Sequence, residues 1–295
     1  MLTLEQLAEL LEHNRAAAAA RVKHFSIGGR KFEFGARPAI MGVVNLSMDS
    51  WYRESVCLTA EAAVHRGQVL AAQGADIIDV GAESTLAHAR RTGQAAQKSQ
   101  LLPVIKALRA KNIPVSVETY SPAVTRACLE AGANLLNLTG TRGSETMYRM
   151  VAAHDAAVII CYVAGNNVRE VGELDLQADP IPMLRDFFAR QIAIAQRQGV
   201  EKIFIDPGLG FYYRNLQDSA VRVRHQMKVF LNTFRLRELG FPICHALPHA
   251  FEFFRDEVRC AEPFFAVLAA LGKTDLFRTH EVPRIKGVLE TMRCY

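Results

Sequence analysis

Closely spaced cysteines are missing from this sequence. It has 295 residues and six cysteines, which lie far apart along the chain, and no two of them form a Cys-x-x-Cys pair. Redox-active dithiols and cysteine-based zinc modules need such pairs, so both are excluded. Widely spaced free thiols are typical of proteins from a reducing compartment, and we therefore expect a cytoplasmic protein.

A long apolar run is missing as well. The N-terminal stretch 2–21 contains five consecutive alanines, but Glu5, Glu9 and Glu12 interrupt it. Crossing a bilayer takes about 20 successive apolar residues, and a signal peptide needs an unbroken apolar core of its own. The stretch therefore predicts an amphipathic helix, and we expect no membrane partner.

Charge of one sign is not concentrated anywhere in the chain. The formal net charge is +5, yet lysines and arginines are scattered among acidic residues. Proteins that bind nucleic acid usually carry a basic run or stripe, so we expect no nucleic-acid partner. Half of the residues are hydrophobic and 22% are charged, a balance that favours a folded chain with a sizeable core.

Strands and helices alternate along most of the sequence. Residues 25–34 alternate around a Gly-Gly turn and predict a hairpin, and short apolar runs then alternate with helical stretches. We predict strands at Ala39–Asn45, Asp76–Val80, Pro114–Glu118, Asn134–Asn137, Ala157–Val163, Lys202–Asp206, Pro242–Ala246 and Leu276–His280. Helices are expected at Thr59–Gln73, Pro122–Ala131, Met183–Gln198 and Asp218–Leu239, among others.

This order of elements predicts one α/β domain with the architecture of a (βα)8 TIM barrel. A doubly wound sheet would alternate in the same way, but the Gly-x-Gly-x-x-Gly turn of a dinucleotide fold follows none of the strands. We expect residues 1–24 to form a helical extension and residues 25–295 to form the barrel. The N-terminal helix and the hairpin would close its bottom.

Five of the expected strands end in polar residues suited to binding, six residues in all. These residues are Asn45, Glu118, Asn137, Asp206, Arg278 and His280. One such residue alone is usually a turn former, but in a barrel all six would converge on one mouth. Two carboxylates and an amide can read the donors of a guanidine-like heterocycle, while Arg, His and Asn suit phosphate oxygens. The inferred ligand has a heterocycle at one end and an anion at the other.

Five segments resemble the signatures of the dihydropteroate synthase family, and they occur in the family's order. They span most of the chain from about Phe25 onward. The segments are Met-Gly-Val-Val-Asn-Leu-Ser-Met-Asp-Ser-Trp at 41–51, Gly-Ala-Asp-Ile-Ile-Asp-Val-Gly-Ala-Glu-Ser-Thr at 74–85, Ser-Val-Glu-Thr-Tyr at 116–120, Asp-Pro-Gly-Leu-Gly-Phe at 206–211 and Arg-Thr-His-Glu-Val at 278–282.

The resemblance implies a transferase that joins a hydroxymethyl-dihydropterin pyrophosphate to an amine such as 4-aminobenzoate and releases pyrophosphate with the help of Mg²⁺. It implies that Glu118, Asn137 and Asp206 bind the reduced pterin. Asn45, Arg278 and His280 would bind the pyrophosphate, and Asn45 would also be a ligand of Mg²⁺, with Asp49 as a second candidate ligand. Arg278 and His280, together with Asp49 in the first loop, would be the catalytic residues.

The resemblance also implies an acceptor pocket near Trp51, Ser84, Thr85 and His249. Relatives commonly pair through their last helices, which implies a homodimer. The N-terminal helix lies outside the matched region, and its role does not follow from the resemblance.

The departures from the family pattern gather on the acceptor side. The family's Ser-Arg-Lys motif after the seventh strand is replaced by residues 246–251, which contain no lysine, and the usual basic residues are also missing at Leu86 and around 212–214. His249 is either a replacement donor or a core histidine. Glu118 stands where the family has Asp. We therefore expect either an acceptor other than 4-aminobenzoate or a loss of acceptor chemistry.

Two other functions stay open at this point. Relatives of the barrel include pterin-dependent methyltransferases, which would need the pterin residues but no pyrophosphate site, so Asn45, Arg278 and His280 argue against that class. A non-catalytic barrel that binds a pterin or a partner protein is the third alternative, because fold alone does not fix function.

Overall fold

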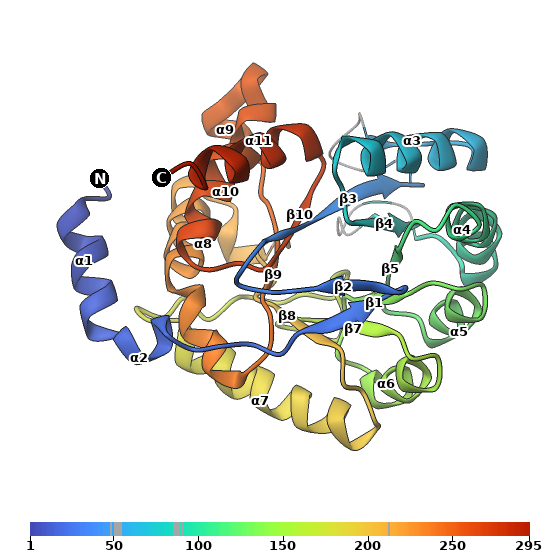
Figure 1. The fold of residues 1–295 in the computed structure, drawn as a ribbon, viewed down its shortest axis with the longest axis horizontal. Helices are drawn as coiled ribbons and strands as arrows, with labels where there is room; N and C mark the ends of the chain where they lie inside the picture. Colours follow the sequence, from blue (N-terminus) through green and yellow to red (C-terminus); the bar gives the residue numbers. More distant parts are fainter. Residues whose placement is uncertain (48, 50–54, 85–88, 90, 212) are drawn as a thin grey trace.

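Eight parallel strands form a barrel in the computed structural model, which describes residues 1–47, 49, 55–84, 89, 91–211 and 213–295 (Figure 1). The strands are β3 (Ala39–Asn45), β4 (Ile77–Gly81), β5 (Val115–Thr119), β6 (Leu135–Leu138), β7 (Ala157–Cys161), β8 (Ile203–Asp206), β9 (Cys244–Ala246) and β10 (Leu276–Thr279). Their order is β8-β7-β6-β5-β4-β3-β10-β9, and a parallel bridge between Ile205 and Ile243 joins the two end strands. The predicted (βα)8 barrel is confirmed.

Helices surround the barrel and connect its strands (Figure 1). They are α3 (Ala60–Gln73), α4 (Gln94–Arg109), α5 (Pro122–Glu130), α6 (Ser144–Ala153), α7 (Ile181–Arg197), α8 (Ser219–Asn232), α10 (Ala261–Leu271) and α11 (Val282–Met292), with the short α9 (Phe251–Phe254) after β9. Three 3₁₀ helices, η2 (Arg214–Leu216), η3 (Thr233–Leu239) and η4 (Arg255–Cys260), adjoin α8 and α10. In the described residues, no helix is long and apolar enough to span a membrane.

The long helix expected at 218–239 changes type part-way. It is α-helical as α8 up to Asn232 and continues as the 3₁₀ helix η3. At the junction, the hydroxyl of Thr233 donates to the carbonyl oxygen of Val229 at 2.7 Å. Such a local side-chain bond competes with the regular backbone pattern and often bends a helix.

The N-terminal stretch differs from the single helix expected at 2–21. It forms α1 (Leu4–His13) and α2 (Arg15–Ala18), which meet at Asn14. The Asn14 side-chain amide donates to the carbonyl oxygen of Leu10 and ends the first helix there. No residue of α1 is buried, and the helix lies apart from the barrel at the edge of the molecule (Figure 1).

The predicted hairpin closes the bottom of the barrel. It consists of β1 (Phe25–Ile27) and β2 (Arg30–Phe32), which pair antiparallel. The rings of Phe25 and Phe34 meet Phe204 of β8 edge-on, with centroid distances of 5.1 and 5.2 Å. These aromatic contacts seal the end of the barrel away from the strand C-termini, as expected from the sequence.

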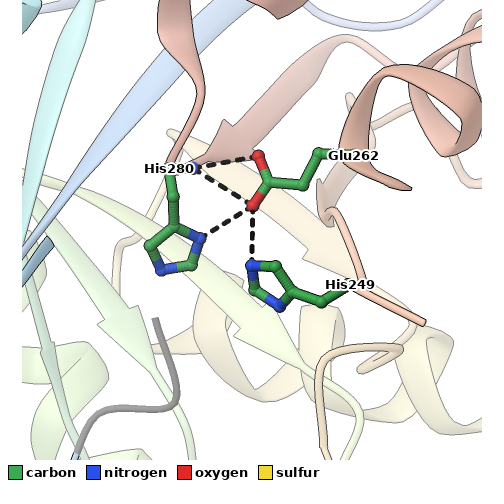
Figure 2. Close-up of side chains that lie close together, drawn as sticks. All are labelled: His249, Glu262 and His280. Carbon is green, nitrogen blue, oxygen red and sulfur yellow. Dashed lines mark hydrogen bonds and ion pairs between the residues drawn. The ribbon is translucent and has the colours of Figure 1, made fainter. Parts of the chain in front are cut away.

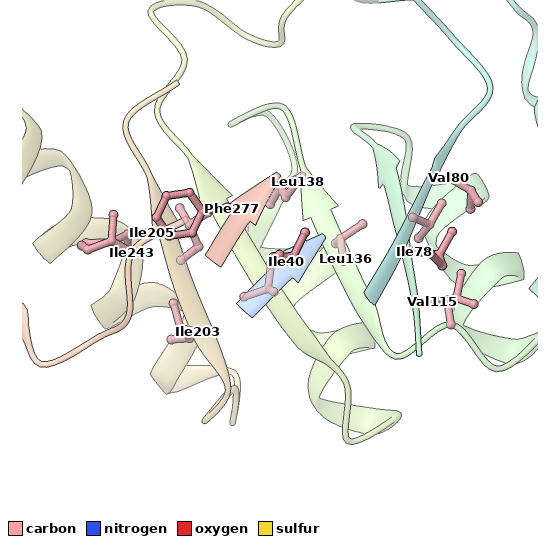
Figure 3. Close-up of a cluster of buried hydrophobic side chains, with 14 of the residues drawn as sticks. Ile40, Ile78, Val80, Val115, Leu136, Leu138, Ile203, Ile205, Ile243 and Phe277 are labelled. Atoms are coloured by element: carbon pink, nitrogen blue, oxygen red, sulfur yellow. The ribbon is translucent and has the colours of Figure 1, made fainter. Parts of the chain in front are cut away.

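Two apolar layers hold the barrel together. Outward-facing strand residues such as Ile78, Leu136 and Phe277 pack in the cluster between strands and helices (Figure 3). Inward-facing residues such as Met41 and Leu135 pack with the hairpin at the bottom. Side chains alternate along a strand, so the next inward position after each bottom residue lies higher in the barrel.

Polar residues take these higher inward positions. Along four strands the inward pairs are Ile77 and Asp79, Leu135 and Asn137, Phe204 and Asp206, and Leu276 and Arg278. Each pair has an apolar residue in the bottom cluster and a polar residue two positions later. The barrel therefore has a dry lower half and a charged upper half that opens at the C-terminal mouth.

We expect the buried ion pair between Arg237 and Asp275 to stabilise the barrel bottom. The guanidinium Nη1 lies 2.5 Å from Asp275 Oδ2, which also accepts from the Ile243 amide at 2.9 Å. Asp275→Ala leaves a buried charge unpaired and should lower the free energy of unfolding by about 3–5 kcal/mol in urea denaturation. Arg15→Ala at the exposed Arg15–Glu12 pair is the control and should change nothing measurable. If the urea concentration at the midpoint of unfolding were the same for Asp275→Ala and wild type, the ion pair would not stabilise the barrel bottom.

Candidate active site

A cavity opens at the C-terminal ends of the strands. It is lined by Asn45, Ser47, Glu83, Ser84, Glu118, Leu209, Gly210, Phe211, Arg222, Gln226, Ala246, Leu247, Pro248, His249, Ala250, Arg278 and His280. Six residues predicted for the site from sequence are in this lining, namely Asn45, Ser84, Glu118, His249, Arg278 and His280. The cavity is where a TIM barrel places its active site.

Arg278 lies between two carboxylates at the floor of the cavity. Its Nε is 2.7 Å from Asp79 Oδ2, and its Nη2 is 2.5 Å from Glu118 Oε2. The sequence interpretation assigned Arg278 to a phosphate and Glu118 to a heterocycle, at opposite ends of the ligand. The structure instead brings the two side chains into direct contact.

Asn137 extends this network toward β7. Its Nδ2 donates to Asp79 Oδ2 at 3.1 Å, and its Oδ1 accepts from the Cys161 thiol at 3.4 Å. The other carboxylate oxygen of Asp79, Oδ1, is buried and accepts no hydrogen bond within the described part of the chain. A buried acceptor of this kind needs a donor from water or from a ligand.

Asp206 stands at the end of β8 on the far side of the network. Its Oδ1 accepts from the Gly208 amide at 2.8 Å, and the side chain is almost fully buried. Burial raises the pKa of Asp206 to about 6, although hydrogen bonds and the charge of Arg278 act in the opposite direction. Near neutral pH this group can therefore act as acceptor and, after protonation, as donor.

The upper barrel holds more negative than positive charge. In the described part of the chain, Asp79 and Glu118 bond to the Arg278 guanidinium, and Asp206 lies near enough to feel its charge. Burial raises the pKa of Glu118, and Asp79 and Asp206 add to this effect against the opposing charge of Arg278. Burial would lower the pKa of Arg278, but Glu118 and Asp79 raise it, so the guanidinium stays charged. The site is electrostatically prepared for a ligand rich in N–H donors.

The first and second loops supply the cavity rim. Asn45 at the end of β3 donates from Nδ2 to the Ser55 hydroxyl at 2.6 Å. The hydroxyl of Ser84 donates to the carbonyl oxygen of Asp49 at 3.1 Å, so the two loops meet there. The predicted acceptor residues Trp51 and Thr85 lie outside the described residues.

His280 and His249 share one buried carboxylate at the other side of the cavity (Figure 2). Glu262 Oε1 lies 2.8 Å from His280 Nδ1 and 3.1 Å from His249 Nε2. Burial alone would raise the pKa of Glu262, but the hydrogen bonds and charges of the two histidines outweigh it, and the pKa lies well below its ordinary value. His249 thus lines the cavity, where it lies beside Glu262.

Comparison with known proteins agrees with this geometry. A family model described as pterin binding enzyme matches residues 41–245, which is more than half of the chain. This chain belongs to the pterin-binding enzyme family. Within that family it is similar to the dihydropteroate synthases of Synechocystis sp. (30% identical over 226 residues, 74% of this chain and 73% of that protein) and Clostridium beijerinckii (32% over 224 residues, 74% and 76%).

Solved structures give the same relationship. A Xanthomonas albilineans dihydropteroate synthase with 4-aminobenzoic acid has a TM-score of 0.76 and 28% identity, covering 92% of this chain and 97% of that one. The same enzyme in complex with 7,8-dihydropteroate has a TM-score of 0.72 and 26% identity over the same shares. The chain is therefore a dihydropteroate synthase-like transferase, as the resemblance implied.

Two residues of α8 line the cavity of this pterin-binding enzyme. Arg222 of α8 lines the cavity and lies 2.7 Å from Glu252 Oε2 of α9. Its Nη1 donates to the carbonyl oxygen of Leu216 at 3.0 Å. Next to it, Gln226 donates to the carbonyl oxygen of Leu209. Glu252, which directly follows the segment that replaces the Ser-Arg-Lys motif, thus places an acid beside the arginine.

Three site residues were missed in the sequence analysis. Asp79 lies inside a quoted signature, and its alternation with Ile77 was a usable signal for an inward position. Glu262 stands in the apolar helix segment 261–271, where a lone acid could have been suspected of a buried role. Arg222 gave no signal, because one arginine among several on a helix is ordinary.

The raised pKa of Asp206 predicts how stability varies with pH. The carboxyl group has a pKa of about 6 when folded and about 3.9 when unfolded, so the folded state binds the proton more tightly. The contribution of this group to the free energy of unfolding should therefore be fully present below about pH 4. It should be lost as the pH rises from about 4 to 6.

Asp206→Asn removes the buried charge and should be more stable than wild type at pH 7.5, by up to about 3 kcal/mol in urea denaturation. The difference should vanish near pH 4. Asp186→Asn on the exposed face of α7 is the control, with no pH-dependent difference expected. A constant offset between Asp206→Asn and wild type at all pH values would refute the assignment.

Proposed function

We propose that this transferase binds a hydroxymethyl-dihydropterin pyrophosphate in the upper barrel and joins it to an amine acceptor, releasing pyrophosphate. The observation that carries the proposal is the buried set of Asp79, Glu118, Asn137 and Asp206 around the Arg278 guanidinium. The solved relatives with 4-aminobenzoic acid and with 7,8-dihydropteroate support the same substrate classes.

The pterin ring fits the acceptors of the network. One edge of a pterin carries an amino group and ring N–H groups in a guanidine-like array, which ionised carboxylates and amide oxygens can accept. Asp206, Asn137 and Glu118 would bind that edge, as predicted, and Asp79 Oδ1 offers a further buried acceptor. Glu118, one methylene longer than the family's aspartate, reaches Arg278 from β5.

Departure of the pyrophosphate requires compensation of its negative charge. Arg278, His280 and Asn45 all line the cavity and would bind and orient the leaving group. Mg²⁺ prefers oxygen ligands, and the bond from Asn45 Nδ2 to Ser55 turns the amide oxygen of Asn45 away from that hydroxyl. Asn45 and the Asp49 carboxylate offer oxygen ligands of the kind that Mg²⁺ prefers, and the ion when bound would neutralise the leaving group.

The acceptor would enter beside the rim formed by Ser84, His249 and the segment 246–250. The only arginine that lines the cavity besides Arg278 within the described residues is Arg222, and Glu252 compensates its charge. A carboxylate on the acceptor would thus meet a pair of zero net charge. We propose that the preferred acceptor is an arylamine with no carboxylate at that position.

The assembly and location are further proposals. Phe264, Val267 and Leu271 are exposed on one face of α10, which supports the expected homodimer through the last helices. All six cysteines are free, in keeping with the proposed cytoplasmic location. We keep residues 1–24 as a separate extension, because α1 buries no side chain.

Pterin binding tests the upper-barrel site. We expect Asp206→Asn to weaken binding of hydroxymethyl-dihydropterin pyrophosphate by about tenfold or more in calorimetric titration, because an acceptor-only group becomes an amide with a donor. Asp186→Asn is the matched control and should bind as wild type. Equal affinity of wild type and Asp206→Asn would remove Asp206 from the site.

The preference of the enzyme between two amine acceptors tests the proposed effect of the Arg222–Glu252 pair. We expect faster pyrophosphate release with aniline than with 4-aminobenzoate at equal concentration, because the Arg222–Glu252 pair offers no net charge to a carboxylate. Glu252→Gln removes the negative charge next to Arg222 and should shift the preference toward 4-aminobenzoate. Preference for 4-aminobenzoate by the unmodified enzyme would contradict this part of the proposal.

A further inference from the structure

We propose that His249, Glu262 and His280 form a site for one divalent transition-metal ion, such as Zn²⁺, at the rim of the cavity. The three residues come from different parts of the fold. His249 follows β9, Glu262 lies in the first turn of α10, and His280 follows β10. Their candidate ligand atoms all lie within 4.8 Å of one another (Figure 2).

The Glu262 carboxylate is oriented as metal-binding carboxylates usually are. Its Oε2 accepts from the Thr279 hydroxyl and from the backbone amides of His280 at 3.1 Å and Glu281 at 3.3 Å. These bonds fix the carboxylate and direct Oε1 toward both imidazoles. Metal ligands are commonly held in this way by hydrogen bonds from a surrounding shell.

The distances are close to those that a bound ion requires. Zn²⁺ binds nitrogen and carboxylate oxygen at about 2.0–2.2 Å, which separates neighbouring tetrahedral ligands by about 3.4 Å. Oε1 lies 2.8 Å from one imidazole nitrogen and 3.1 Å from the other. Opening of the cluster by roughly 0.5 Å would admit the ion. His249 belongs to a loop, where so small a movement is easy.

The ligand set selects the kind of ion. Two imidazoles and one carboxylate suit Zn²⁺ or Co²⁺, whereas Mg²⁺ prefers oxygen ligands alone. The site is therefore distinct from the proposed Mg²⁺ position at Asn45. His249 and His280 both line the cavity, so a fourth coordination position would face it and could hold an oxyanion. Use of that position for a phosphate oxygen rests on the proposed function, but binding of the ion does not.

The test is a titration of the full-length protein, first treated with a chelator, with Zn²⁺ in the calorimeter and without pterin. We expect one ion per chain and no displacement by a large excess of Mg²⁺. His249→Ala and His280→Ala should each lower the affinity by about tenfold or more. His65→Ala, on the exposed face of α3, is the matched control and should bind as wild type.

A second measurement distinguishes loss of a metal ligand from loss of the folded structure. Co²⁺ bound to wild type should give the visible absorption bands typical of a four-coordinate ion, and these should be lost in His249→Ala while its circular dichroism spectrum stays that of the folded protein. Absence of stoichiometric Zn²⁺ binding, or equal binding by His249→Ala and wild type, would overturn the proposal. Pterin binding measured in the presence of chelator tests the proposed function separately.

Discussion

The contact of the Arg278 guanidinium with Asp79 and Glu118 is the constraint on which the site depends. Three carboxylates in the upper barrel would repel one another if no cation stood among them, and burial makes that repulsion stronger than it would be in water. Arg278 compensates part of this charge and joins β10 to β4 and β5 across the barrel. The negative charge that Arg278 does not compensate can be stabilised by a ligand with hydrogen-bond donors. This uncompensated charge therefore explains both the unsatisfied acceptors and the proposed binding function.

The barrel makes this arrangement possible because each strand contributes to the core at its lower positions and to the site at its upper positions. The lower inward positions pack against the hairpin and exclude water, while the position two residues later is polar. A strand such as β8 thus supplies both Phe204 to the core and Asp206 to the site. Packing at the bottom fixes the strand register, and the register in turn fixes which polar side chains meet at the mouth.

Sequence alone was sufficient for the barrel and for much of the site, because both depend on local patterns. The strand β3 was predicted at its observed bounds, and Asn45, Glu118 and Asn137 were expected at the mouth because polar residues at strand ends converge in a barrel. Pairings across the barrel could not be found in this way. The contact of Arg278 with Asp79 joins residues 199 positions apart, and that of Glu262 with His280 depends on how α10 docks beside β10. The break at Asn14 was also missed, since the alanines around it favour one continuous helix.

The partly uncompensated charge of the upper barrel has a consequence for the amount of protein in the cell. A molecule that binds only the folded state stabilises it by mass action, in proportion to the logarithm of its concentration above the dissociation constant. A ligand that supplies donors to Asp79 and Asp206 removes an internal repulsion and would act in this way. The steady-state level of this enzyme in a cell would then follow the supply of its own substrate, through turnover of the unfolded chain and without any dedicated regulator.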